Sequence, residues 1–463
     1  MRYVSTRGAA PELSFEAAML AGLARDGGLY LPESWPQLDA ATIGGFSGLS
    51  YEEVAVAVMR SFVGEAFSEV EFREIVGRAY AAFDHPARCP LVQIGPSDWI
   101  LELHHGPTLA FKDVAMQLIG RMFDAVLARR GERVAIVGAT SGDTGSAAIE
   151  AFRGLDAADV FILYPHGRVS EVQRRQMTTP SEPNVHAVAV EGDFDACQAL
   201  VKAMFSDLPF RDEMRLGAVN SINWARVMAQ VVYYFTAAVA LGAPAREIAF
   251  SVPTGNFGDV FAGHVARAIG LPVAGLVIAT NENDILHRTL VTGRHEKAGV
   301  VPTITPSMDI EVSSNFERLL WELYDRDGAA VRQLMEELRA GGFALRQGAA
   351  TTLRSQFASG RADQAQTSAM IARVARETGL VIDPHTAVGL VAAEQARGDR
   401  AIPMVTLGTA HAAKFPDAVE AACGLRPALP ARMADLFDRP ERIDVLPNDL
   451  AALQSYIRER ARP

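Results

Sequence analysis

The sequence predicts an α/β fold made of two parallel-sheet subdomains preceded by a helical N-terminal domain. After about residue 96, six short runs rich in β-branched residues alternate with helical segments, as in parallel sheets covered by helices on both faces. Before that point the chain shows amphipathic helices and no alternating strand pattern. The 463 residues, 49% hydrophobic and 21% charged, can bury a large core and have the length of about three domains.

Residues 1–95 form the predicted helical domain. The stretch from Ser14 to Ala24 has helical spacing of apolar residues, and Ser14 is placed to cap its first turn. Two further amphipathic stretches begin at Ser50 and Ser68, and each serine is followed three residues later by a glutamate. Serine and glutamate at this spacing cap a helix reciprocally, so we expect a helix to begin at each of these serines.

The α/β region spans residues 96–427, and its strands form two packets, 133–220 and 247–290, followed by a last strand. Strands are expected at 133–140, 159–165, 184–192, 247–255, 274–280 and 402–409. A helical insertion is expected over 314–398. The C-terminal tail, 428–463, is expected to pack on the surface.

Composition and charge exclude several functional classes. The net charge of −11 disfavours a nucleic-acid-binding protein, which needs a basic surface for phosphates. The three cysteines show neither a CxxC pair nor a histidine at ligand spacing, so we expect no metal and a reducing compartment. The N-terminus lacks an apolar signal segment, and the uncharged stretch between Arg226 and Arg246 contains polar residues that favour a buried helix. We therefore expect a cytoplasmic protein that acts on a small molecule, without nucleic acid, membrane or obligatory protein partner.

Three predicted strands end in loops rich in glycine, serine and threonine, at 138–145, 253–259 and 406–411. Ligands of open α/β sheets bind beyond the carboxyl ends of the strands. Glycines let the backbone approach a ligand closely, and amides at helix N-termini bind anions. An ordinary turn between strand and helix explains the first loop equally well. Several such loops in one chain indicate a phosphorylated cofactor and an anionic substrate.

Lys112 is the strongest candidate for covalent chemistry. The chain has only four lysines, Lys112, Lys202, Lys297 and Lys414, whereas its other basic residues are arginines, which cannot serve as amine nucleophiles. A Gly-Pro turn leads from His104 and His105 to Lys112 at the start of a helix. The helix dipole and apolar neighbours there favour the neutral amine that a Schiff base requires. The alternative is a solvated lysine at a helix start, a position that disfavours a cation.

Five motifs in order carry a family resemblance: HHGPTLAFKD, GATSGDTGSAA, NSINWARV, PTGNFGD and LGTAHAAKFPDAV. Together they resemble the threonine synthase family, pyridoxal-phosphate enzymes of fold type II, the tryptophan-synthase-β-like class. The resemblance extends from MRYVSTRG to LPNDLAALQSYI and is closest to the bacterial and fungal long form. It departs at Ala412, where the family usually has proline. That change affects the expected rigidity of the loop rather than the chemistry.

The resemblance implies a role for each matching residue. Lys112 would hold pyridoxal 5′-phosphate and shuttle protons. The cofactor phosphate would be bound by Gly255, Asn256, Phe257 and Gly258, followed by Asp259, while Thr409 would face the pyridine nitrogen and Asp143 the 3′-oxygen. The substrate carboxylate would be bound by Thr140, Ser141 and Thr144, and the substrate phosphate by Asn220, Ser221 and Arg226. Structural roles are expected for the side chains nearby, namely His104, His105, His385, His411, Glu102 and Asp383.

The implied reaction converts O-phospho-L-homoserine and water into L-threonine and phosphate by β,γ-elimination and replacement, the last step of threonine biosynthesis. Two alternatives remain at this point. One is another fold-type-II enzyme, such as a serine/threonine dehydratase or a cysteine synthase, which needs no second phosphate site. The other is a non-catalytic α/β protein that binds a phosphorylated ligand. Arg226 distinguishes a threonine synthase from the other fold-type-II enzymes, unless it only caps a helix or forms an ion pair with one. The context of Lys112 argues against the non-catalytic binding protein.

Overall fold

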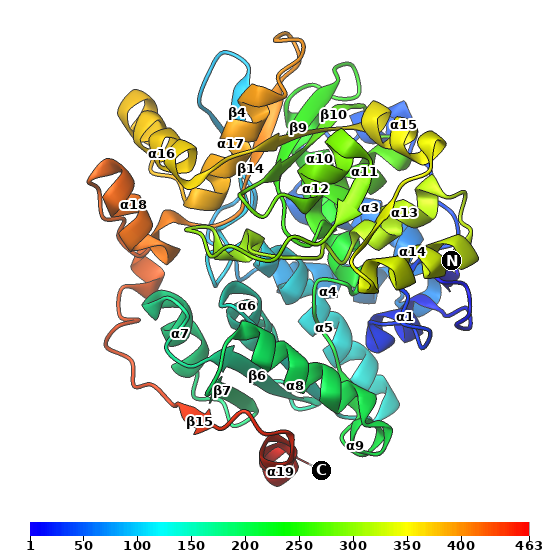
Figure 1. The fold of residues 1–463 in the computed structure, drawn as a ribbon, viewed down its shortest axis with the longest axis vertical. Helices are drawn as coiled ribbons and strands as arrows, with labels where there is room; N and C mark the ends of the chain where they lie inside the picture. Colours follow the sequence, from blue (N-terminus) through cyan, green and yellow to red (C-terminus); the bar gives the residue numbers. More distant parts are fainter. Residues whose placement is uncertain (463) are drawn as a thin grey trace.

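The computed structural model describes residues 1–462 and contains two parallel sheets in separate halves of the molecule (Figure 1), as predicted. The larger sheet has six strands in the order β13-β10-β9-β14-β4-β3. Only β3 runs antiparallel to its neighbour within this sheet. The strands are β3 (Leu91–Gln93), β4 (Asp98–Glu102), β9 (Ile248–Pro253), β10 (Val273–Thr280), β13 (Phe357–Arg361) and β14 (Met404–Gly408).

The smaller sheet is entirely parallel and has five strands in the order β15-β7-β6-β5-β8. The strands are β5 (Val134–Ala139), β6 (Ala158–Pro165), β7 (Val185–Val190), β8 (Leu216–Gly217) and β15 (Asp444–Leu446). All six strands predicted from the sequence are therefore confirmed. They are the β5, β6, β7, β9, β10 and β14 of the structure.

Both faces of the smaller sheet are covered, which explains why every residue of β6 is buried and why the strand is apolar from Val160 onward. Successive residues of β6 alternate between two hydrophobic cores: Val160 and Ile162 pack on the side of α5 (Lys112–Arg130) and α6 (Asp143–Phe152). Phe161 and Leu163 pack instead with α8 (Phe194–Ser206) and α19 (Leu450–Arg460). The tail thus completes the second core, and its strand β15 adds an edge to the sheet, beyond the surface packing expected.

The N-terminal region contains α1 (Phe15–Ala21), α2 (Ala40–Gly44), α3 (Tyr51–Val63) and α4 (Glu69–Tyr80). Ser14 caps α1, and Ser50 and Ser68 form capping boxes, so these predictions are confirmed. A small antiparallel pair, β1 (Tyr3–Ser5) and β2 (Tyr30–Pro32), was not expected. These helices share one hydrophobic core with α10 (Trp224–Ala240), in which Trp224 packs against Tyr3 and Phe62. The domain boundaries at 95 and 427 stay predictions.

The stretch from 314 to 398, expected to be helical, also contains two strands. Its helices are α13 (Phe316–Leu323), α14 (Gly328–Arg339), α15 (Gln347–Gln356), α16 (Gln364–Thr378) and α17 (Pro384–Gln395). The strand β12 (Gly342–Ala344) pairs with β11 (Arg294–Glu296), and β13 forms an edge of the larger sheet. The sequence of β13, FASGR, has no β-branched residue, and its extended form comes from pairing with β10.

The uncharged stretch after Arg226 is the buried helix that the sequence predicted. Every residue of α10 from Trp224 to Phe235 is buried in the core. Within residues 1–462, none of the helices combines the length and the apolarity needed to cross a membrane.

Candidate active site

Lys112 is the first residue of α5 and is buried. The preceding residues are fixed by the loop that follows β14, because Phe111 N donates to Thr409 O at 2.8 Å and Ala110 pairs with Ala410. The predicted position of the lysine at a helix N-terminus is thus confirmed. The alternative of a solvated lysine is contradicted by its burial.

The surroundings of the Lys112 amine favour its neutral form. Its Nζ lies 3.4 Å from Asp143 Oδ2 and 4.7 Å from the centre of the Phe111 ring. Burial lowers the pKa of the amine, against the opposing charge of Asp143, and the positive charges of Lys414 and Arg226 lower it further. A lysine with a lowered pKa is suited to act as nucleophile and base.

Asp143 is the first residue of α6 and joins several elements at the site. Its Oδ1 accepts from Lys414 Nζ at 2.8 Å and from Gln173 Nε2 at 2.9 Å, while Ser307 Oγ lies 3.3 Å from Oδ2. The carboxyl is fully buried, but the charges of Lys414 and Lys112 outweigh that penalty and hold its pKa well below the usual range. Sequence reasoning did not place Gln173 or Ser307 here, and it offered Lys414 only as the next candidate if Lys112 did not hold the cofactor. Only Lys414 carried a signal, as one of the four lysines.

The loop after β5 presents two open hydroxyls. Ser141 and Thr144 are half-buried at the N-terminus of α6, and neither hydroxyl has a partner among residues 1–462. The Thr140 hydroxyl accepts from Gly142 N and Gly145 N, both at 2.9 Å, which shapes the turn. Its own proton stays available to an acceptor. The loop can therefore bind a carboxylate with hydroxyls and helix amides.

The loop after β9 has the form of an anion cradle. A Cβ at Gly255 would come within 2.6 Å of Ser307 O, so the backbone packs too closely there for any side chain. Phe257 has a positive φ of 63° and precedes α11 (Gly258–Ala268), whose first amides point out of the helix. Asn256 Oδ1 lies 3.4 Å from Ser314 Oγ.

Asp259 belongs to this cradle through its backbone. Its carboxylate accepts from Tyr233 at 2.5 Å and from Tyr234 at 2.9 Å. Burial raises the pKa of this carboxyl to about 6, although both tyrosines lower it. Near pH 7 this carboxyl is still mostly ionised, so its amide, and not its side chain, suits an anion.

Arg226 is a buried cation without a carboxylate partner. It occupies the third position of α10, and its Nη1 lies 3.4 Å from Val219 O, whereas its Nε has no partner in the described part of the chain. No Asp or Glu oxygen of residues 1–462 lies within 4 Å of its guanidinium, so the alternative of an ion pair within the protein is not supported. Burial lowers the pKa of Arg226 to about 10. A buried, unpaired guanidinium is costly unless an anion binds it.

The segment before Arg226 contains Asn220 and Ser221, which differ in their exposure to solvent. Asn220 is exposed, and its Oδ1 accepts from Ile222 N at 3.3 Å. Ser221 is half-buried, and its carbonyl accepts from Asn315 Nδ2 at 3.1 Å. Asn315 also donates to Asn256 O at 3.0 Å, which ties this segment to the cradle after β9.

Arg318, which sequence reasoning missed, supports the same junction. It is fully buried and donates to Ile222 O at 2.6 Å, to Tyr30 O at 2.8 Å and to the Asn315 side chain. Burial lowers the pKa of Arg318 to about 9. Nothing in the local sequence marked Asn315 or Arg318, because their partners are backbone carbonyls distant in the chain.

The nearby histidines pack and orient loops. His105 lies between Glu102, at 2.8 Å, and Asp84, at 3.2 Å. Burial lowers the pKa of His104 to about 4, so it is neutral at physiological pH. Together with Glu102, Asp383 and His411, His104 lines a cavity of about 100 Å³ behind the loop of Thr409.

His385 orients the segment that carries Ser307. Its Nδ1 lies 2.9 Å from Asp383 Oδ1, and its Nε2 accepts from Ser307 N at 3.3 Å.

Ala412 opens a short 3₁₀ turn, Ala412–Lys414. The first position of such a turn also accepts proline.

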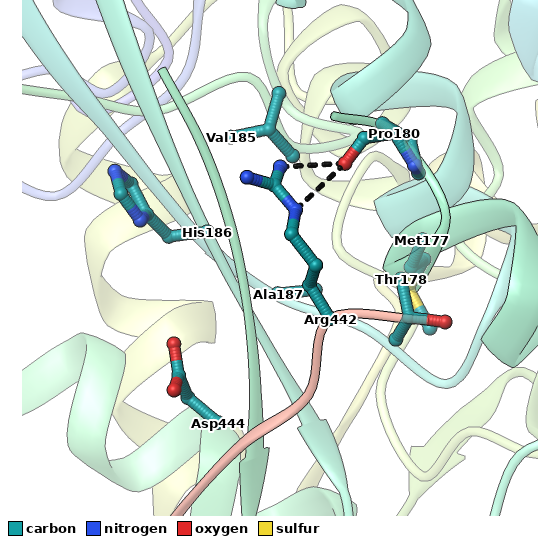
Figure 2. Close-up of a pocket in the computed structure, with 8 residues that line it drawn as sticks. All are labelled: Met177, Thr178, Pro180, Val185, His186, Ala187, Arg442 and Asp444. Atoms are coloured by element: carbon teal, nitrogen blue, oxygen red, sulfur yellow. Dashed lines mark hydrogen bonds between the residues drawn. The ribbon is translucent and has the colours of Figure 1, made fainter. Parts of the chain in front are cut away.

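A second cavity, of about 80 Å³, lies beside β7 under the tail (Figure 2). Arg442 donates there to Pro180 O, and none of the predicted site residues lines the cavity. We therefore assign the chemistry to the site around Lys112.

That site fits pyridoxal phosphate. A buried lysine supplies the amine, the glycine cradle at the N-terminus of α11 fits a phosphate group, and Arg226 supplies a separate charge for a second anion. The donors are those that a phosphorylated aldehyde and an anionic amino acid require.

Comparisons with known proteins agree with this geometry. Family models described as threonine synthase N terminus, pyridoxal-phosphate dependent enzyme, and threonine synthase, C-terminal, match residues 2–80, 88–338 and 386–457. A threonine synthase of Pseudomonas aeruginosa is 56% identical, with 99% of this chain and 98% of the relative covered. The crystal structure of PLP-bound threonine synthase from Brucella melitensis matches with a TM-score of 0.98 and 57% identity, covering 100% of both chains. The yeast threonine synthase structure matches with a TM-score of 0.94 and 40% identity, covering 99% of this chain and 98% of the other. The chain therefore belongs to the threonine synthase family of pyridoxal-phosphate-dependent enzymes.

Proposed function

We propose that this chain converts O-phospho-L-homoserine and water into L-threonine and phosphate, a carbon–oxygen lyase reaction. The observation that carries the proposal is the buried, unpaired guanidinium of Arg226 near Lys112. The cofactor phosphate has its own cradle after β9, so a second cation without a partner suits a phosphorylated substrate. A serine/threonine dehydratase needs no such group.

The cofactor is held by three groups of residues. The backbone of Gly255, Asn256, Phe257 and Gly258, with the amide of Asp259, binds its phosphate at the N-terminus of α11. Thr409 would face the pyridine nitrogen, and Asp143 would lie beside the 3′-oxygen. When bound, pyridoxal phosphate supplies an electron sink for negative charge that develops on the substrate carbons.

Lys112 holds the cofactor and moves the protons. Its lowered pKa allows the freed amine to accept a proton from Cα of the substrate, and the proton is returned later in the reaction. Asp143, at 3.4 Å, orients the amine between these transfers. Loss of a second proton, at Cβ, accompanies departure of the phosphate from Cγ. A proton is then delivered to Cγ, which becomes the methyl group, and water adds at Cβ.

The substrate is oriented from both ends. Thr140, Ser141 and Thr144 bind its carboxylate with hydroxyls and helix amides, while Asn220, Ser221 and Arg226 bind its phosphate. The two anion sites lie on different elements, α6 and α10, and together they fix the reacting carbons beside Lys112.

The test is a product analysis with purified holoenzyme. With O-phospho-L-homoserine, we expect phosphate and L-threonine in equal amounts. With L-serine or L-threonine alone, we expect 2-oxo acid only as a minor side product. Rapid 2-oxo acid formation without threonine synthesis from the phosphorylated substrate would reassign the enzyme to the dehydratases.

The proposed setting is the cytoplasm, with the small-molecule substrate as the sole partner required. All three cysteines are free thiols, which suits a reducing compartment. Fractionation of cells that express the tagged full chain tests this setting. Recovery of activity with the membrane or an exported fraction would contradict it.

A further inference from the structure

We propose that Lys414 is a positioning residue, which fixes Asp143 against Lys112 and adds a second positive charge that keeps the Lys112 amine neutral. The inference rests on the role proposed above for Lys112. Lys414 has no exposed surface, and a buried ammonium group requires anionic or carbonyl partners.

Lys414 contacts two segments that also position Lys112. Its Nζ lies 2.8 Å from Asp143 Oδ1 and donates to Thr108 O, also at 2.8 Å. The other oxygen of the same carboxylate lies 3.4 Å from Lys112 Nζ. Thr108 belongs to the turn that leads into α5, so Lys414 joins that turn to the start of α6.

Lys112 and Lys414 share the carboxylate of Asp143, so its single negative charge can balance only one of the two ammonium groups. Asp143 carries one negative charge, whereas Lys112 and Lys414 would carry two positive charges if both were protonated. The shorter contact to Asp143 and the added contact to the Thr108 carbonyl favour the charge on Lys414. Lys112, at the longer distance and at a helix N-terminus, is then the amine that loses its proton.

This electrostatic role differs from simple packing. Gln176 Nε2 also donates to Thr108 O, at 3.1 Å, and is buried without being charged. If Lys414 only anchored the turn, loss of Gln176 would have a similar effect on Lys112. If its charge matters, only loss of Lys414 changes the protonation of Lys112. Gln176 therefore provides a matched control.

The experiment measures how the rate of acylation of individual lysines by acetic anhydride depends on pH, in the full-length protein freed of cofactor. Mass spectrometry gives the labelling of Lys112, with exposed Lys202 as the reference in the same molecule. In the parent protein, Lys112 should titrate at lower pH than Lys202. In Lys414→Met, the pKa of Lys112 should rise by about one unit, because a charge within about 4–6 Å of a titrating group shifts its pKa by about one unit or more. Lys414→Arg and Gln176→Met should each stay within about 0.3 units of the parent.

Three results would overturn the proposal: Lys112 of the parent titrates with Lys202, Lys414→Met leaves the titration unchanged, or Gln176→Met shifts it as much as Lys414→Met. If the methionine variant does not fold, Lys414→Gln replaces it. If neither folds, a shift of about one unit in the charged Lys414→Arg variant contradicts the electrostatic role. The labelling needs no cofactor, so its failure leaves threonine formation untouched. Loss of threonine formation from the parent enzyme would, in turn, leave the labelling result unchanged.

Discussion

At the level of single residues, the role proposed for Arg226 separates the candidate substrates. If Arg226 binds the substrate phosphate as proposed, replacement by alanine removes a charge-assisted contact worth about 1.5–3 kcal/mol. We expect kcat/KM for O-phospho-L-homoserine to fall by about tenfold to a hundredfold in Arg226→Ala, as measured by phosphate release. Inhibition by free phosphate should weaken in parallel. Cofactor affinity should not change, because the cradle after β9 is intact.

Arg226→Lys is the control for charge. It keeps a cation but loses the planar fork, so its kcat/KM should lie between those of the parent and the alanine variant. A collapse of cofactor affinity in Arg226→Ala, or unchanged phosphate inhibition, would move Arg226 out of the substrate site. The main reason to prefer threonine synthesis over dehydration would then be lost.

Lys112 provides the second prediction for a single residue. Lys112→Ala should have no measurable turnover, because no other amine is placed to hold the cofactor covalently; the one nearby, Lys414, is engaged by Asp143 and Thr108. The variant should fold and still bind some cofactor through the cradle. Borohydride reduction should label the parent at Lys112 and leave the variant unlabelled. Exposed Lys202→Ala should behave as the parent in both assays. Fixation of the cofactor in Lys112→Ala would assign the covalent role to another lysine.

At the scale of secondary structure elements, the sequence predicted what depends on local pattern. Buried β-branched runs gave β5, β6, β7, β9, β10 and β14, and serine–glutamate spacing gave the starts of α3 and α4. The elements that it missed owe their form to distant partners. The strand β13 extends along β10, and β15 extends along β7. Short strands without a β-branched pattern form through such pairing, which no local window contains.

The candidate site also contains residues that a local motif predicted and residues that it did not. Glycine- and hydroxyl-rich sequences after strands predicted the loop after β9, the loop after β5 and Thr409. Three supporting side chains have no motif around them: Ser307 lies in the connection after β11, Asn315 directly precedes α13, and Arg318 lies within α13. They act through hydrogen bonds to backbone carbonyls, to one another and to Asp143, which only the folded chain brings within reach.

Asn315 tests the junction between the segment before α10 and the loop after β9. Asn315→Ala removes the side-chain donor to Ser221 O and an acceptor of Arg318, while Asn256 O keeps the bond from the backbone N of residue 315. Unfolding free energy should fall by about 1–3 kcal/mol. Because both loops loosen, KM for the substrate and Kd for the cofactor should both rise. The measurements are chemical denaturation, steady-state kinetics and cofactor titration.

Asn184→Ala is the matched control. Asn184 is equally buried and bonds to the carbonyls of Phe152 and Ala158, away from the site. Its loss should lower stability by a similar amount and leave KM and Kd unchanged. Unchanged KM and Kd in Asn315→Ala would show that the junction does not position the loops.

At the scale of the whole molecule, stability depends on histidines buried without charge. His264 on α11 stacks between Phe261 and Phe357, and burial lowers its pKa to about 3. In the unfolded chain a histidine binds a proton below about pH 6.5, whereas the folded protein resists protonation of His264. Proton uptake by the unfolded state therefore lowers the stability of the folded protein as pH falls from about 6.5 toward 3.

His264→Phe removes this effect while keeping the stacked ring. Below about pH 6 the free energy of unfolding of the parent should fall, relative to this variant, by about 1.4 kcal/mol per pH unit. Urea denaturation between about pH 5 and 7 measures the difference. His166→Gln, at an exposed position, controls for the loss of a histidine as such. Parallel pH curves for the parent and His264→Phe would contradict the account.

Segments that follow strands of both sheets meet around Lys112, so both halves of the molecule contribute to one site. The central claim is that phosphate leaves by elimination at carbon and that water enters at Cβ. The most direct measurement is the reaction of the holoenzyme with O-phospho-L-homoserine in H₂¹⁸O, analysed by mass spectrometry of both products. Elimination breaks the carbon–oxygen bond, so we predict one ¹⁸O in the threonine hydroxyl and none in the phosphate. Label in the phosphate, with homoserine as the other product, would show hydrolysis at phosphorus and contradict the account.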